Sequence, residues 1–204
     1  AVFTEGTAGT VTFDGGVTQT ITNTGGETFY SLTTNTAGTV LTLASGTDIT
    51  VTNTLTLTEG LYNLNGGTFT LGSTGTASTL TRTASTTTNW MYGGTFKRFW
   101  IANTAISSTA APLYGLFPMG TSAAASYRPV EINTSVSPTA DGYFTVSHTI
   151  VSGLLDLNPV YNDGGTNIVR IIKSQFNTAI SGITDGTYDI YVTMTGLLAT
   201  GNLS

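Results

Sequence analysis

The chain has 204 residues, only 8% of them charged, and its formal net charge is −5 with an isoelectric point near 4.5. An ordinary soluble domain is roughly 25% charged, so solubility here depends on hydroxyl groups, and 45 of the residues are threonine. The six basic residues are scattered. This excludes a nucleic-acid interface and disfavours an anionic membrane surface, because both need clustered lysine and arginine.

The chain contains no cysteine, which excludes disulfides and thiolate metal sites. No stretch approaches the roughly 18 apolar residues that read as a membrane span, so we expect no membrane insertion. The first residues lack a signal-peptide pattern, and the closing ATGNLS adds no recognisable element. We therefore expect a fragment of a longer protein.

Residues 1 to about 84 have the pattern of very short strands separated by turns. From Phe29 to Leu71, apolar residues alternate with threonine, and a period of two indicates a strand with one buried face. Glycine-containing breaks such as Ser-Gly-Thr and Gly-Gly mark the turns. We expect the interior to hold Leu41, Leu43, Ile49, Val51, Leu55 and Leu57. We expect the solvent face to hold Thr42, Thr50, Thr52, Thr54, Thr56 and Thr58.

Similar strands recur about every 25 residues, at 29–34, 54–59 and 79–84. A fixed period between about 20 and 50 residues is typical of stacked-repeat proteins. We predict a right-handed parallel β-helix with three short strands per coil. An antiparallel sandwich of the same strands is the alternative.

Residues 85–129 are aromatic and proline-rich, and we interpret them as the cap or junction that ends a β-helix-like region spanning 1–129. Between Trp90 and Trp100 the segment gathers five aromatic residues around Lys97 and Arg98. One interpretation is a glycan-binding surface. Its ligand residues would be Trp90, Tyr92, Arg98 and Trp100. The other, which we favour, is a packed cap with Lys97 and Arg98 directed outward.

Residues 130–204 predict a small antiparallel β-sandwich. Phe144, Val146, His148 and Ile150 share one parity, and a similar alternation runs from Tyr188 to Met194. Asp-Gly turns separate strands of six to nine residues. No stretch has a period of 3.6, so we expect an all-β chain with essentially no helix.

The sequence offers little chemistry, and we predict that the protein is not an enzyme. His148 is the only histidine; its parity predicts a buried side chain, and zinc or a catalytic triad is disfavoured. The acids lie mostly in turns, without the close pairing that glycosidases need. We expect no cofactor. The one metal site that we consider is a structural calcium bound by a loop, with Asp156, Asn158, Asn162 and Asp163 as its candidate ligands.

Three motifs carry a family likeness: GGTFKRF at 93–99, FPMGT at 117–121 and YRPVEI at 127–132. Together with the Thr/Gly-rich strands before them, they resemble the repetitive regions of very large surface proteins of Bacteroidota. Those proteins are exported by the type IX secretion system and include adhesins and gliding-associated proteins. The 204 residues include no C-terminal sorting domain of the kind that such proteins carry, which agrees with the expectation of a fragment. The resemblance implies an extracellular, cell-surface location, an adhesive or filament-forming role and no catalytic residues.

We therefore expect a non-catalytic structural or adhesive segment of a large surface or filament protein. Its expected partners are neighbouring domains of the same long chain or identical subunits, and surface glycans in the second hypothesis. That second hypothesis is a glycan-binding module built on the aromatic cluster. A polysaccharide-active β-helix enzyme is the third.

Overall fold

The computed structural model describes residues 8–75, 77–85, 88–123, 126–163 and 166–192. These residues form strands and connecting loops with no helix. Accordingly, nothing in this part of the chain is a helix long and apolar enough to cross a membrane. The prediction of an all-β chain is confirmed.

The N-terminal half is a β-solenoid of about three turns. β1 (Thr10–Phe13) and β2 (Gln19–Ile21) pair in parallel with β3 (Glu27–Leu43), which pairs in parallel with β4 (Ile49–Asn63). β4 in turn pairs with β5 (Thr68–Leu71), β6 (Thr79–Arg82) and β7 (Trp90–Tyr92). β3 and β4 are long because each bends around a whole coil, with register shifts where it bends.

The spacing predicted for the recurring strands is confirmed by the register. Thr10, Ser31, Thr54 and Thr79 are successive partners on one side of the solenoid, 21, 23 and 25 residues apart. Unequal coils still stack in register because extra residues are placed in the corners. Only the residues within each ladder must match their neighbours.

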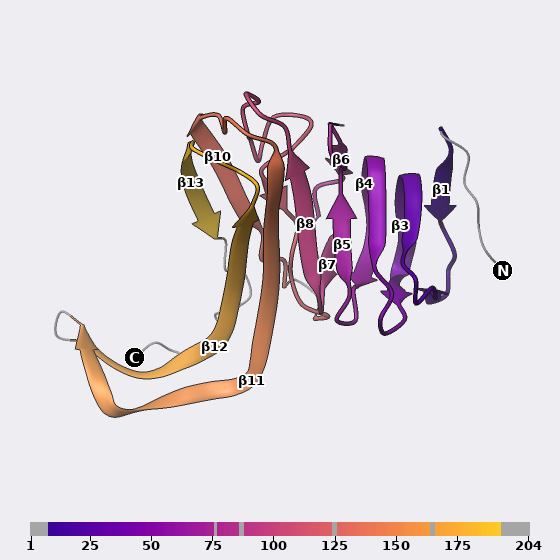
Figure 1. The fold of residues 1–204 in the computed structure, drawn as a ribbon. Coiled ribbons are helices and arrows are strands. Elements are labelled where there is room, and N and C mark those ends of the chain that lie inside the picture. The colour runs from indigo at the N-terminus through magenta and orange to yellow at the C-terminus, as the bar shows by residue number, and fades with distance from the viewer. Residues whose placement is uncertain (1–7, 76, 86–87, 124–125, 164–165, 193–204) are drawn as a thin grey trace.

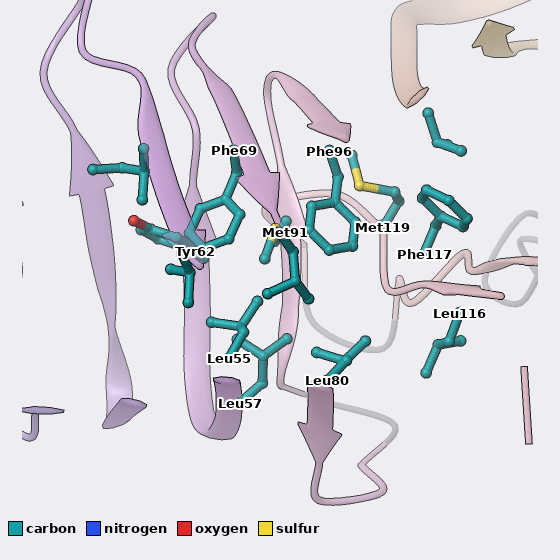
Figure 2. Packing of buried hydrophobic residues seen from close by; sticks show 14 of the residues in the cluster. Leu55, Leu57, Tyr62, Phe69, Leu80, Met91, Phe96, Leu116, Phe117 and Met119 are labelled. Atoms are coloured by element: carbon teal, nitrogen blue, oxygen red, sulfur yellow. The ribbon is translucent and has the colours of Figure 1, made fainter. Parts of the chain in front are cut away.

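The solenoid interior is filled by the parity that the sequence predicts. Leu32, Leu55 and Leu80 form one stacked column and are at most 1% exposed. Leu41, Tyr62 and Met91 form another. Figure 2 shows Leu55, Leu80, Tyr62 and Met91 inside the stack. Burying each leucine contributes about 1.5–3 kcal/mol, whereas threonines between them, such as Thr42 and Thr50, remain partly accessible.

A line of ring contacts, which we call the aromatic spine, joins the solenoid to the rest of the molecule. Neighbouring ring centroids lie 5.1–6.0 Å apart, a distance that favours offset or edge-to-face packing. Its members, in order of contact, are Tyr62, Phe69, Phe96, Phe117, Phe144, Trp100 and Tyr188. The spine belongs to one continuous hydrophobic cluster.

The C-terminal half is antiparallel. β8 (Thr95–Trp100) continues the solenoid from β5 and pairs with β11 (Gly142–Asp163), which pairs with β12 (Thr166–Ser181) to complete a ten-stranded sheet. β9 (Leu116–Phe117), β10 (Val130–Val136) and β13 (Thr187–Val192) form a separate three-stranded sheet. In Figure 1 the β11–β12 hairpin extends beyond the stack as a two-stranded ribbon.

The domain boundary predicted between residues 129 and 130 lies within a region of dense contacts. Strand pairing crosses it in both sheets, through β8–β11 and β9–β10. The aromatic spine also crosses it, because Phe117 contacts Phe144 at 5.3 Å. The two halves thus share hydrogen bonds and a hydrophobic interior.

Candidate functional site

The two tryptophans of the aromatic segment lie in the core. Trp90 in β7 is fully buried and donates from Nε1 to the Thr121 carbonyl oxygen at 2.8 Å. Trp100 in β8 is also fully buried; it donates to the Tyr114 carbonyl oxygen at 2.9 Å and stacks on Phe144. Each indole therefore has its polar group satisfied inside the protein. This arrangement supports packing over sugar stacking.

The glycan-binding residues predicted from the sequence do not share an exposed surface. Tyr92 is half-buried at the end of β7, and burial raises the pKa of its phenol. Arg98 and Trp100 lie on the inward face of β8, beyond the Gly93-Gly94 corner. Of the four predicted residues, Tyr92 alone retains accessible surface.

The prediction that Arg98 is directed outward is wrong. Arg98 follows Val51 and Leu71 in an inward column and is fully buried. Its Nη1 donates to the carbonyl oxygens of Leu113 and Leu116, and desolvation lowers its pKa to about 9. Arg98 thus bonds to the backbone of the loop that covers the end of the solenoid, and these hydrogen bonds help to fix the conformation of that loop.

Lys97 has the opposite orientation. It alternates with Arg98 along β8 and is partly exposed, with its Nζ 4.0 Å from the centre of the Tyr143 ring. This cation–π contact joins β8 to β11 on the outer face of the ten-stranded sheet.

The FPMGT and YRPVEI motifs meet where the last coil is closed. Met119 bridges to Met91 as a parallel partner, and Tyr127 lies between the Arg82 guanidinium, at 4.0 Å, and the Trp90 ring, at 5.7 Å. Burial raises the pKa of Tyr127 to about 12, and Arg82 opposes this shift. The sequence analysis missed the contribution of Arg82, because the TLTR segment carries no signal that its arginine contacts Tyr127, 45 residues further along the chain.

His148 is buried, as its parity predicts, at the junction of the cap with β11. Its Nδ1 lies 3.2 Å from the Gly120 carbonyl oxygen and its Nε2 lies 3.5 Å from Arg128 Nη1, while the ring packs 4.5 Å from that of Phe176. Burial lowers the pKa of His148; the hydrogen bond with the Gly120 carbonyl opposes this shift, and the nearby positive charge of Arg128 adds to it.

We expect acid to destabilise the fold through His148. Because its pKa is lowered in the folded state, the unfolded chain binds the proton first as pH falls below about 6.5. The free energy of unfolding should be independent of this group above that pH and should fall below it. Urea unfolding over a pH series measures this. The free energy of unfolding should vary less with pH for His148→Gln than for the wild type, and identical pH profiles would show that His148 is not the responsible group.

An open depression lies over the same junction. It has a volume of about 430 Å³ and is lined by Gly93, Gly94, Thr95, Ser147, His148 and Thr149. Hydroxyl groups and backbone dominate this lining, and no carboxylate is among the lining residues. The depression therefore offers hydrogen bonds to a ligand but lacks the acid pair of a glycosidase.

The expectation that the calcium candidates lie on a loop is wrong. Asp156, Asn158 and Asp163 belong to β11, and Asp156 and Asp163 pair with Arg170 and Thr166 of β12. Their side chains lie outside the described residues, so calcium binding stays a prediction. In the described part of the chain, no group of three or more His, Asp or Glu residues is placed to hold a metal ion.

The most regular surface feature is a set of hydroxyl side chains on one side of the solenoid, which we call the TxT array. It consists of Thr10 and Thr12, Ser31 and Thr33, Thr54 and Thr56, and Thr79 and Thr81. Each pair flanks one inward residue on β1, β3, β4 or β6, and the pairs are in register along the solenoid. No charged residue lies within the array.

No family model matches this chain, and neither a curated protein nor a solved structure matches it.

Proposed function

We propose that the chain is a non-catalytic structural and adhesive segment of a large extracellular surface or filament protein. The observation that carries this proposal is the continuous ten-stranded sheet, which extends from β1 to β12 without a break in hydrogen bonding. Such a sheet makes a stiff element whose coils contact mainly their neighbours. Its natural partners are adjoining domains of the same chain or identical subunits.

The surface chemistry supports adhesion through hydroxyl groups. Outward threonines recur on the solenoid side formed by β1, β3, β4 and β6 and again at Thr28, Thr50 and Thr70. With only 8% charged residues, two such surfaces approach without strong repulsion. The likeness of the GGTFKRF, FPMGT and YRPVEI motifs to type IX-exported adhesins and gliding-associated proteins supports a cell-surface location.

Salt dependence tests the proposal. The chain is attached to a force probe, and detachment from a hydroxylated surface is measured at about 0.15 M and about 1 M salt, where the Debye length falls from about 8 to about 3 Å. Hydroxyl-mediated adhesion should keep its detachment force. No adhesion above that of a coated control probe, or a force that collapses with salt, would overturn it.

A further inference from the structure

The TxT array has the geometry of a two-dimensional lattice. Neighbouring rungs of a sheet lie about 4.7–4.9 Å apart, and alternate residues along a strand about 6.6 Å apart. The in-register pairing of β1, β3, β4 and β6 applies both spacings to the array. The result is two parallel columns of hydroxyl side chains, four rungs long.

The side chains of the array are held in place by the buried apolar residues that alternate with them. The residues between the paired hydroxyls are Val11, Leu32, Leu55 and Leu80, and the last three are at most 1% exposed. Threonine is branched at Cβ, so few rotamers are open to it on a strand. The positions of the methyl and hydroxyl groups are therefore fixed before any ligand arrives.

The hydroxyl groups of the array are available to a ligand. Within the described residues, its threonines make no side-chain hydrogen bond to another protein group. Thr39 and Thr52, by contrast, donate to backbone carbonyl oxygens. Ser31 is the exception in the array, because Asn53 donates to its hydroxyl at 3.1 Å and it is only 6% exposed.

We propose that the TxT array binds ice. Its repeats of about 4.7–4.9 Å and about 6.6 Å are close to the two repeats of the oxygen atoms on the prism face of hexagonal ice. The hydroxyls would take lattice positions, and the methyl groups between them would order the intervening water. A crystalline polysaccharide fits less well, because sugar rings stack on aromatic faces and the array contains none. This ligand is independent of the proposed adhesive role.

The experiment measures thermal hysteresis and partition of the full chain into a slowly growing ice front. Thr56→Tyr places a bulky ring in the middle of the array. Thr50→Tyr is the matched control: both threonines lie on β4, are partly exposed and have a threonine in register on each side, but Thr50 is on another side of the solenoid. The double variant Thr33→Val/Thr56→Val keeps the side-chain volume and removes two hydroxyls.

The wild type and Thr50→Tyr should show hysteresis and enter the ice. Thr56→Tyr should lose both properties, and the double valine variant should lose most of the hysteresis. Far-UV circular dichroism verifies folding; if Thr56→Tyr unfolds, the double valine variant decides. A folded wild type that shows no hysteresis and is excluded from ice would overturn the proposal, as would equal losses in Thr50→Tyr and Thr56→Tyr. The adhesion measurement at room temperature is unaffected by either result.

Discussion

Replacing Trp100 by alanine is expected to cost about 3–5 kcal/mol of folding stability, the range for removing a buried aromatic side chain. Trp100 is fully buried between Phe144, at 5.1 Å, and Tyr188, at 6.0 Å. Its loss would open a cavity in the aromatic spine and leave the Tyr114 carbonyl oxygen without its donor. Urea unfolding followed by circular dichroism measures the change.

Tyr191→Ala is the control for Trp100→Ala. Tyr191 lies on β13 with 55% of its surface exposed, so its removal should change stability by no more than about 0.5 kcal/mol. Equal unfolding midpoints for the two variants would show that Trp100 is not part of the core. Any loss of glycan binding in Trp100→Ala has to be judged against this loss of stability.

Gly60→Ala is expected to be the most disruptive glycine substitution in the solenoid corners. Gly60 has a φ of +88°, and a Cβ there would overlap the hydroxyl and carbonyl oxygens of Thr36 in the preceding coil. The left-handed conformation costs about 1–2 kcal/mol and overpacking about 1–3 kcal/mol. We expect a loss of about 2–5 kcal/mol in the free energy of unfolding.

Gly38→Ala separates the two contributions. Gly38 has a φ of +68°, but a Cβ there meets no atom within 4 Å, so only the conformational cost of about 1–2 kcal/mol applies. Adding Thr36→Ala to Gly60→Ala should recover part of the loss, because one of the two colliding oxygens is removed. If Gly38→Ala and Gly60→Ala are equally destabilising, the close contact between coils is disproved.

The solenoid could be predicted because its signals are local. Alternation placed Leu41, Val51 and Leu57 in the interior, where they are at most 1% exposed. The recurrence of similar strands gave the coil length that the pairing of Ser31, Thr54 and Thr79 confirms. Both signals depend on one strand or on adjacent coils, which a single sequence displays directly.

Arg98 shows where hydropathy misled the prediction. In TFKRFW it shares its parity with Phe96 and Trp100, but the aromatic residues of this segment lie on both parities, so alternation did not decide its orientation. Its charge suggested an outward orientation, because an arginine is seldom buried without a partner. The partners that permit its burial are carbonyl oxygens of Leu113 and Leu116, in a loop with no periodic pattern to reveal them.

The contacts between the two halves could not be predicted from pattern either. Alternation shows which face of β11 is buried, but it does not show that Thr145 pairs with Lys97 or Val146 with Phe96. The TxT array lay within the threonine pattern, yet its significance depends on the register between coils. Both the β8–β11 pairing and the register of the TxT array depend on contacts between strands, which the pattern within one strand does not reveal.

The aromatic spine determines where the chain tolerates being cut. A break after residue 129 would strip Phe144 and Tyr188 from Trp100 and Phe117 and would leave β8 without its β11 neighbour. Each piece would then expose an apolar surface and an unpaired strand edge, a combination that promotes aggregation. Limited proteolysis should accordingly spare this point, and the halves should melt together as one cooperative unit.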